Sequence, residues 1–208
     1  MMPAGTGMKR TWPFFCLAVL LALTAMVYWP ASEAVDLPPP MTLSQAQALP
    51  DERLVLELTM DVSARVLRTA SQPGSWRSLP EAARHLWVAT TMVPDLARDG
   101  ILTYLVTRPD DAPGLVEVAA ACTALGATRL AAVCNEALQV ASGNQAVTAC
   151  RAYVAQEHNP PFVRPPGFTD PYAAISGRFT EALNQDGFEQ RSLDYAKLHL
   201  TEIIAEPR

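Results

Sequence analysis

The sequence predicts an all-α protein: an irregular orthogonal bundle of seven or eight helices, preceded by an N-terminal apolar membrane or signal helix. Three observations support this fold class. Alanine and leucine dominate a chain that is 50% apolar, whereas only 10 of its 208 residues are glycine, and such a composition favours helix over sheet. Beyond residue 49, apolar residues recur at three- and four-residue steps, as on one face of a helix. No strand-type alternation of useful length interrupts them.

An uncharged segment near the N-terminus predicts a membrane or signal helix within residues 1–34. Lys9 and Arg10 precede this apolar run, residues 12–29, and basic residues on that side favour an N-terminus in the cytoplasm. The run of 18 residues is short for a membrane span and slightly long for the core of a signal peptide. Two interpretations therefore stay open: an uncleaved anchor, or a signal peptide cleaved after Ala34.

Both interpretations place the folded part of the chain outside the cytoplasm. An uncleaved anchor gives a single-pass protein of the bacterial inner membrane whose C-terminal domain is periplasmic or otherwise extracytoplasmic. Cleavage near Ala34 gives a periplasmic or secreted protein. The three prolines at residues 38–40 favour an extended, stiff spacer. We therefore interpret residues 35–48 as a Pro-rich linker and residues 49–206 as a single helical domain.

The first half of this domain predicts two long helices and one short apolar element. Leucine and valine spacing predicts an amphipathic helix over residues 51–70, which a Pro-Gly turn ends. Ser78 and Glu81, three residues apart, predict a capping box at the start of the next helix. Pro94 is expected to kink or end that helix. Residues 101–106 form the short apolar element, either helix or a strand with nothing to pair with.

The second half predicts five helices, joined by short connections except for the Pro-rich segment before the fourth. Gly126 and the Ser-Gly pair at 142–143 are typical ends of helices, and helices joined by such short turns pack antiparallel. Asp170 followed by Pro171 predicts a helix start. The five helices are expected at residues 115–125, 127–141, 146–157, 171–184 and 189–205.

Short motifs in the middle of the chain match a known domain. Residues 98–101 (Arg-Asp-Gly-Ile) form a turn after a helix, residues 125–127 (Leu-Gly-Ala) close a later helix, and an alanine-rich helix follows. With these motifs, residues 79–138 resemble the DNA-mimic-protein-like helical domain family, a bacterial domain of largely unknown function. The resemblance implies an all-helical fold and identifies Asp99, Gly100 and Ile101 as the family turn. Asp99 replaces a family glycine there, and Ile101 replaces an aromatic residue.

One branch of that family binds a transcription factor by presenting acidic side chains as DNA-like charge, so an acidic DNA mimic is one hypothesis for this protein. Residues 35–208 carry 14 basic and 20 acidic residues, a net charge of −6. No nucleic-acid binding is expected, because that needs a basic patch. Mimicry needs a dense array of carboxylates and a cytoplasmic partner, whereas here Asp95 and Asp99 flank Arg98 and the domain is expected outside the cytoplasm.

The sequence contains no nucleophile elbow, phosphate loop, dinucleotide fingerprint or zincin motif. We therefore predict no catalytic residue, no metal site and no cofactor, although a small envelope hydrolase with an unrecognised site stays an alternative. His199 and Glu202 share a helix face but lack further metal ligands nearby in the sequence. His85 is expected at the surface or the boundary of a helix.

Three cysteines, Cys122, Cys134 and Cys150, lie in the predicted domain. Cys134 and Cys150 are at similar distances from the turn at Gly143, so antiparallel helices would bring them together as a candidate disulfide in an oxidising compartment. The alternative interpretation is three small buried apolar residues.

The Pro-rich segment at residues 157–172 supplies the candidate partner-binding residues, Phe162, Arg164, Phe168 and Tyr172. Aromatic side chains on a stiff loop can form a docking surface, or they can pack back on the bundle, because exposed apolar patches are rare. Our leading hypothesis is a non-enzymatic helical module, attached to the membrane through residues 12–29 or exported, that binds another protein in the cell envelope.

Overall fold

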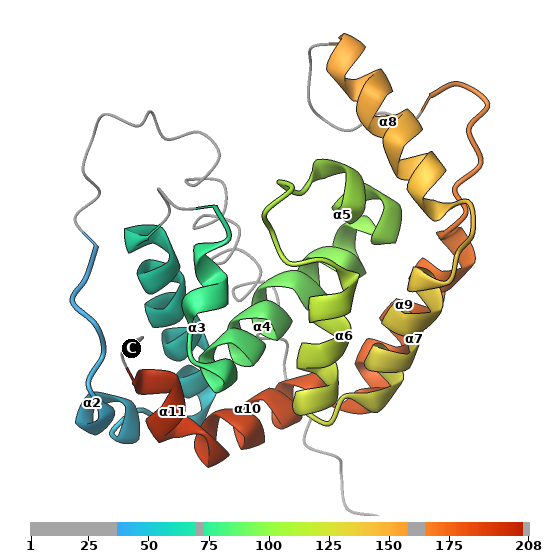
Figure 1. The fold of residues 1–208 in the computed structure, drawn as a ribbon. Coiled ribbons are helices and arrows are strands. Elements are labelled where there is room, and N and C mark those ends of the chain that lie inside the picture. The colour runs from blue at the N-terminus through green and yellow to red at the C-terminus, as the bar shows by residue number, and fades with distance from the viewer. Residues whose placement is uncertain (1–36, 70–72, 158–164, 206–208) are drawn as a thin grey trace, which may run out of the picture. The chain divides into compact units, whose positions relative to one another are not determined.

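The computed structural model of the protein describes residues 37–69, 73–157 and 165–205. Within these residues all regular structure is helical, so the predicted all-α class is confirmed (Figure 1). The chain divides into two units, Met1–Leu37 and Pro38–Arg208, and the described helices belong to the second unit. The apolar segment at residues 12–29 lies outside the described residues. Among the helices that are described, none has the length and hydrophobicity needed to cross a bilayer.

Ten α-helices and one 3₁₀-helix follow one another in the described part of the chain. They are α2 (Leu43–Gln47), α3 (Asp51–Arg68), η1 (Ser75–Ser78), α4 (Glu81–Asp99), α5 (Ile101–Thr107), α6 (Leu115–Ala124), α7 (Thr128–Leu138), α8 (Gly143–Glu157), α9 (Ala173–Asp186), α10 (Phe188–Leu198) and α11 (Leu200–Ile204). Two helices more than expected are present, because the predicted linker contains α2 and the last predicted helix is divided into α10 and α11.

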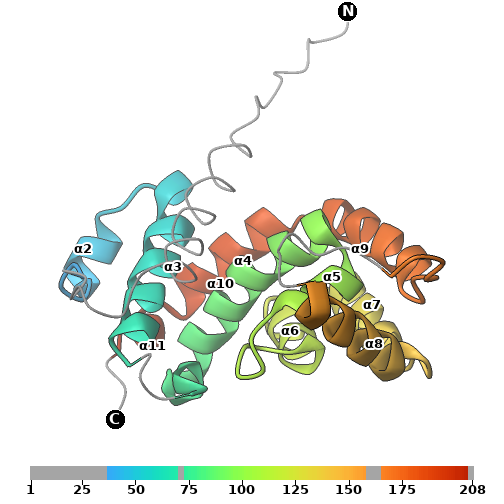
Figure 2. The same cartoon turned by 90° about the horizontal axis from the view of Figure 1, so that it is seen from above.

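The central element is α4, which packs against α3, α5, α6, α9, α10 and α11. Figures 1 and 2 both show it between α3 on one side and α6 on the other. Pro94 lies inside this helix and does not end it. A proline in a helix interior costs roughly 3 kcal/mol, but Val93 and Leu96 on either side are fully buried. Tertiary packing therefore outweighs the local preference, and α4 continues to Asp99.

A buried ion pair joins both ends of the folded unit to α3. Arg65 pairs with Asp61 and also donates to the carbonyl oxygens of Ile203 (2.9 Å) and Ala205 (3.0 Å). The second carboxylate oxygen of Asp61 accepts the N–H of Met41 at 2.7 Å. These bonds fix the segment before α2 and the end of α11 on the same helix.

Part of the predicted linker is folded. Thr42 caps α2 through a capping box, and Ala46 in that helix is buried. Because α2 also packs against α11, the folded unit begins at Pro38, and the predicted boundary at residue 48 is wrong. The short helix was hidden in the sequence because the three prolines before it dominate the local pattern.

The C-terminal segment bends at His199 and supplies the cap of α4. The bend brings Ile203 into the core and places Glu202 Oε1 3.0 Å from the N–H of Ala82, in the first turn of α4. Ser78, the predicted capping residue, instead lies in η1 and donates to a carbonyl of that turn. A carboxylate distant in sequence therefore replaces the predicted local capping box.

A second distant cap organises α7. Asp186, at the end of α9, is buried, and its Oδ2 accepts the N–H groups of Arg129 (2.9 Å) and Leu130 (3.0 Å). A carboxylate at this position satisfies unpaired amides and complements the helix dipole. The turn that follows Asp186 is formed by Gly187, which has a positive φ of 60°.

The candidate disulfide between Cys134 and Cys150 is not formed. Both residues are buried, and Cys134 is a free thiol. The prediction assumed that α7 and α8 pack antiparallel, but α8 packs chiefly against α5, while α7 packs against α6 and α9. The alternative interpretation of small buried apolar residues describes the cysteines better.

Candidate functional site

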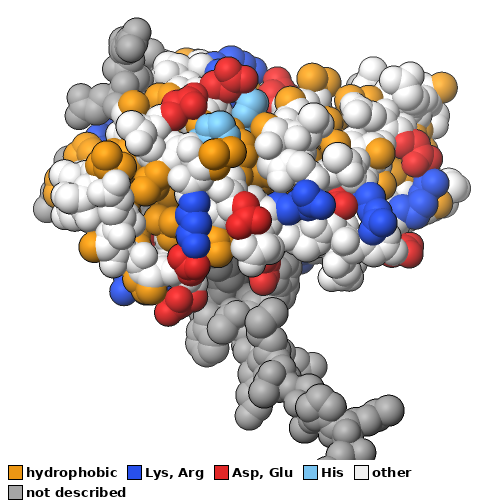
Figure 3. Space-filling view, turned by 90° about the horizontal axis from the view of Figure 1, so that it is seen from below, with side chains coloured by type: hydrophobic (Ala, Val, Ile, Leu, Met, Phe, Trp, Pro, Cys, Tyr) orange, Lys and Arg blue, Asp and Glu red, His pale blue; other side chains and the backbone are white. Residues whose placement is uncertain are grey.

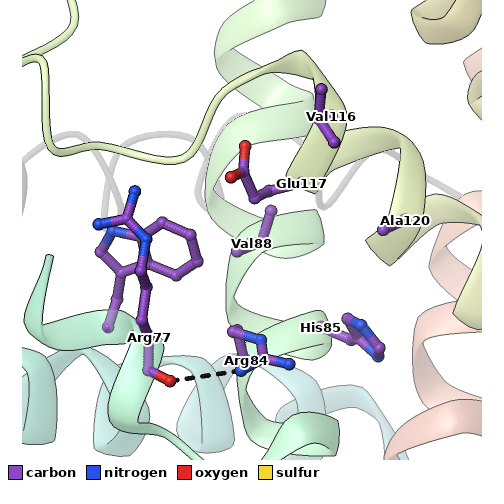
Figure 4. A pocket seen from close by; sticks show the side chains of 8 residues that line it. Arg77, Arg84, His85, Val88, Val116, Glu117 and Ala120 are labelled. Carbon is purple, nitrogen blue, oxygen red and sulfur yellow. Dashed lines mark hydrogen bonds between the residues drawn. The ribbon is translucent and has the colours of Figure 1, made fainter.

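A surface pocket between η1, α4 and α6, called here the η1–α4–α6 pocket, is the strongest candidate site in the described part of the chain. Its volume is about 310 Å³, at the lower end of the range for ligand sites. It is lined by Trp76, Arg77, Arg84, His85, Val88, Val116, Glu117 and Ala120. Figure 4 shows Arg84 and His85 projecting from α4, and Val116 and Ala120 from α6.

Arg77 is held over an aromatic ring at one side of the pocket. Its Cζ lies 4.5 Å from the centre of the Trp76 ring, a favourable cation–π geometry. Trp76 is buried, and its Nε1 donates to the carbonyl oxygen of Asp111 at 2.7 Å. Gly74 begins the turn with a positive φ of 70°, and a Cβ there would lie 2.1 Å from Arg77 Nη1. Glycine therefore leaves room for the guanidinium.

Arg84 lies beside Arg77 and donates to its carbonyl oxygen at 3.3 Å (Figure 4). Neither arginine forms an ion pair with any residue that the structure describes. Six other described basic side chains pair with carboxylates: Arg53, Arg65, Arg98, Arg151, Arg178 and Lys197. Four more donate to backbone or amide oxygens instead: Arg68, Arg108, Arg129 and Arg191. The pocket thus gathers two guanidinium groups that form no ion pair with the residues the structure describes.

The α6 side of the pocket combines apolar surface with one acidic group. Val116 is 61% exposed, which is unusual for a large aliphatic side chain in this protein. Glu117 Oε2 accepts the N–H of Gly114 at 2.8 Å and so caps α6. The pocket therefore offers an apolar wall opposite the arginines, with Glu117 already committed to the backbone.

His85 connects the pocket to a cluster that includes a second histidine. Its Nδ1 is 3.4 Å from the Tyr195 hydroxyl, and its Nε2 is 4.0 Å from Glu81. The Tyr195 ring packs against the His199 ring with centroids 4.4 Å apart, and His199 Nδ1 is 3.7 Å from Glu202. Figure 3 shows histidine side chains close together on this face, beside acidic ones.

Burial sets the protonation of His85 and Tyr195 at neutral pH. Desolvation lowers the pKa of His85 below its ordinary value near 6.5, although Glu81 opposes the shift. Burial, with smaller contributions from Glu202 and Glu81, raises the pKa of Tyr195 to about 12. His85 is therefore neutral and Tyr195 is protonated near pH 7. The positive charge of the pocket at that pH comes from its arginines.

Neither metal ligands nor activated thiols gather elsewhere in the described residues. No group of three or more histidine, cysteine or acidic side chains is placed there to hold a metal ion. Burial raises the pKa of the Cys134 thiol to about 12, and it also raises the pKa of Cys122. Thiols in such surroundings are unreactive.

The predicted partner-binding residues do not form an aromatic surface where the structure describes them. Phe162 and Arg164 lie outside the described residues. Phe168 is half-buried and packs against the core, while Tyr172 is buried. The Tyr172 hydroxyl fills the space beside Gly143, where a Cβ would lie 2.0 Å from it. Burial takes most of Tyr172 out of solvent, and Phe168 keeps only part of its surface exposed, so these two residues agree with the alternative that they pack back on the bundle.

The family-turn residues form a structural corner between α4 and α5 and do not line the pocket. Asp99 pairs with Arg98 at 2.7 Å. Gly100 has a positive φ of 81°, a conformation that glycine adopts readily. Ile101 is fully buried, and its N–H donates to Ser176 Oγ of α9 at 3.1 Å. Residues 101–107 are helical, so the strand alternative for this element is wrong.

Sequence reasoning missed Arg77 and Arg84 as site residues. Glu81 precedes Arg84 by three positions, a spacing that predicts a local ion pair. The structure places Glu81 near His85 instead. The tryptophan–arginine pair after a glycine turn was the available signal, but only the packing of η1 against α4 and α6 reveals that both arginines share one pocket.

Comparisons with protein-family models, with curated proteins and with solved structures give no match to this chain. The resemblance to the DNA-mimic-protein-like family therefore stays a prediction. The functional proposal depends on the chemistry of the described residues.

Proposed function

We propose that this protein is a non-enzymatic helical module that binds another protein in the cell envelope through the η1–α4–α6 pocket. It is tethered to the bacterial inner membrane by residues 12–29 or exported after cleavage near Ala34. One observation carries the binding proposal: the exposed Val116 lies in the same pocket as Arg77 and Arg84, which have no carboxylate partner among the described residues.

The composition of the pocket is typical of a protein–protein contact. Arginine and aromatic side chains are enriched among the residues that dominate binding energy, and they usually lie beside apolar surface. The three elements that form the pocket contribute buried residues to one core, among them Trp76, Val88 and Val118. The surface is therefore preformed, which lowers the entropic cost of binding.

The two alternative functions receive less support from the pocket. His85 and Glu117 could transfer protons, but none of the lining residues carries a hydroxyl or thiol that could act as a nucleophile. On the face that Figure 3 shows, acidic side chains are interspersed with basic ones and do not form a continuous array. A binding protein therefore agrees better with these features than a hydrolase with a covalent intermediate or a DNA mimic.

Site-specific photo-crosslinking in intact cells tests the proposed binding surface. The photoreactive residue p-benzoylphenylalanine replaces Val116 in the full-length chain, and in a control chain it replaces Met60 of α3, which is 53% exposed and does not line the pocket. We expect a discrete protein adduct from position 116 and none from position 60. Absence of an adduct at 116, or equal adducts at both positions, would contradict this function.

A C-terminal fusion to a reporter that is active only outside the cytoplasm tests the proposed compartment. Reporter activity is expected, and activity confined to a cytoplasmic reporter contradicts the envelope location. N-terminal sequencing of the mature chain separates the two forms, since a chain that starts at Val35 has lost its tether.

A further inference from the structure

We propose that the η1–α4–α6 pocket recognises an acidic side chain within a segment of the partner protein. Arg77 and Arg84 bind the carboxylate, while Val116 and Ala120 contact apolar atoms next to it. This inference rests on the proposed function and adds the chemistry of the partner.

The charges of the pocket complement an acidic ligand. Residues 35–208 have a net charge of −6. Six of the twelve described arginine and lysine side chains pair with carboxylates, whereas Arg77 and Arg84 share one pocket and have no such partner among the described residues. Among the described residues, Arg77 places its guanidinium against the Trp76 ring, and Arg84 donates to one carbonyl oxygen. Guanidinium groups bind carboxylates in a forked geometry that neither a histidine nor a lysine reproduces. Two such groups in one pocket select for negative charge.

The two arginine side chains are partly fixed in place before a ligand binds. Stacking on Trp76 restricts the rotamers of Arg77, and Trp76 is itself fixed by its bond to the carbonyl of Asp111. Long basic side chains otherwise lose about 1.5–2 kcal/mol of conformational freedom when they are immobilised. Arg84 is half-buried on the central helix. Both donors are therefore partly ordered before a ligand arrives.

The occupied helix ends favour an acidic side chain over a chain terminus. Recognition of terminal carboxylates usually employs backbone N–H groups. The start of α4 is taken by Glu202, which accepts from Ala82, and the start of α6 is taken by Glu117, which accepts from Gly114. Recognition therefore falls to the arginine side chains, and a surface pocket admits a residue from the middle of a passing segment.

Removal of the negative charge of Glu117 is expected to strengthen binding of an acidic ligand, whereas removal of the arginines weakens it. The Glu117 carboxylate lines the same pocket and would repel a bound carboxylate. Glu117→Gln keeps an oxygen that can accept from Gly114, so α6 stays capped while the repulsion disappears. An acidic ligand should then bind more tightly, whereas a neutral ligand should be unaffected.

The test follows binding of two peptides to the full chain in nanodiscs of zwitterionic lipid. The probes are acetyl-Gly-Leu-Glu-Leu-Gly-amide and the same peptide with glutamine at its centre. Methyl resonances of ¹³C-labelled Val88 and Val116 report contact with the pocket. We expect the glutamate peptide to shift both resonances and the glutamine peptide to bind about tenfold more weakly, as loss of a charge-assisted hydrogen bond predicts.

Matched variants assign the effect to the pocket. The double variant Arg77→Gln/Arg84→Gln should lose the preference for glutamate. The control Arg53→Gln/Arg178→Gln removes the same charge from exposed arginines of α3 and α9 and should keep the preference within about twofold, because exposed charges outside the pocket are screened. Glu117→Gln should increase affinity for the glutamate peptide alone.

Several results would overturn the inference. Equal affinity of the unaltered chain for the two peptides would contradict the inference. This result needs no variant, so it does not depend on whether a variant folds. A preference that survives Arg77→Gln/Arg84→Gln also contradicts it. If inorganic phosphate shifts the same resonances with comparable affinity, the pocket is a general anion site. If neither peptide binds but the crosslinked adduct still forms from position 116, only the proposed acidic ligand is contradicted. If the adduct itself does not form, the proposed function is contradicted.

Discussion

Replacement of Arg65 by methionine is expected to destabilise the folded unit strongly. The side chains of Arg65 and Asp61 are each only 6% exposed. Arg65 also donates to the carbonyl oxygens of Ile203 and Ala205, and Asp61 accepts from the Met41 N–H. Methionine has a similar length but no donors. The substitution therefore leaves a buried carboxylate without its cation and two carbonyls without their partner.

The magnitude follows from this geometry. Breaking a buried ion pair by removing one partner typically costs 3–5 kcal/mol, so we estimate about 4 kcal/mol for Arg65→Met. For a domain of this size, each kcal/mol lowers the melting temperature by roughly 2–4 °C, so a decrease of about 8–16 °C is expected. The exposed pair of Arg53 and Glu57 is the comparison, and Arg53→Met should cost less than about 1 kcal/mol.

Urea unfolding of the full chain in detergent, followed by circular dichroism, measures these free energies. A double-mutant cycle with Asp61→Asn isolates the interaction, because asparagine still accepts from Met41 while it removes the charge. The double variant should be less destabilised than the sum of the single variants by about 1–3 kcal/mol. The reasoning would be refuted if the free energy of unfolding of Arg65→Met lay within about 1 kcal/mol of that of the unaltered chain. Strict additivity of the two single substitutions in the cycle would also refute it.

Three further predictions concern buried polar groups. Asp186→Ala should lower the free energy of unfolding by about 2 kcal/mol, because α7 loses the acceptor of two N–H groups, and Asp186→Asn should cost less; urea titration measures both. Cys134, with its pKa raised to about 12 by burial, should react with a maleimide at pH 8 on the order of a thousandfold more slowly in the folded than in the unfolded chain. Burial lowers the pKa of His85 from 6.5, so the unfolded chain binds more protons and stability falls as pH decreases below that value; His85→Gln should flatten this dependence in melting curves between about pH 5 and 7.5.

Each of these predictions has a result that contradicts it. Equal stability of Asp186→Ala and the unaltered chain would mean that water replaces the carboxylate as the cap of α7. Labelling of Cys134 at the same rate before and after denaturation would mean that its site opens readily. For His85, the same loss of stability at low pH in the glutamine variant would assign the pH dependence to other groups.

The sequence predicted those helices whose limits are written locally. The long helix α3 follows from leucine and valine spacing, and the end of α6 follows from Gly126. The turn between α9 and α10 follows from Gly187. In each case the apolar period or the glycine lies within the segment itself. Short-range preferences of the backbone therefore suffice to place these elements.

Other parts of the fold depend on partners far away in the chain. Pro94 remains helical in an α4 that packs against six other helices, and the bend at His199 accompanies the hydrogen bond between Glu202 and Ala82. The candidate disulfide is not formed for the same kind of reason, since α8 packs chiefly on α5. No local pattern carries this information.

The candidate site was still less accessible to sequence reasoning. Phe168 and Tyr172 were chosen for their residue types, yet Tyr172 is buried and Phe168 packs partly against the core. Arg77 and Arg84 were not singled out, because no local pattern shows which basic side chains share a pocket. The residue type predicts which contacts a side chain can make. The residues packed around it in the fold decide whether it is free to bind a ligand.

The sequence by itself determined the helical class and the limits of several helices, because apolar period and glycine positions act over a few residues. Only the tertiary structure decided which helices touch, which buried charges are compensated and which arginines share a pocket. Those outcomes depend on contacts such as the one between Arg65 and Ile203, 138 positions apart. Burial and electrostatic pairing are properties of the packed chain, so they emerge only when distant segments meet.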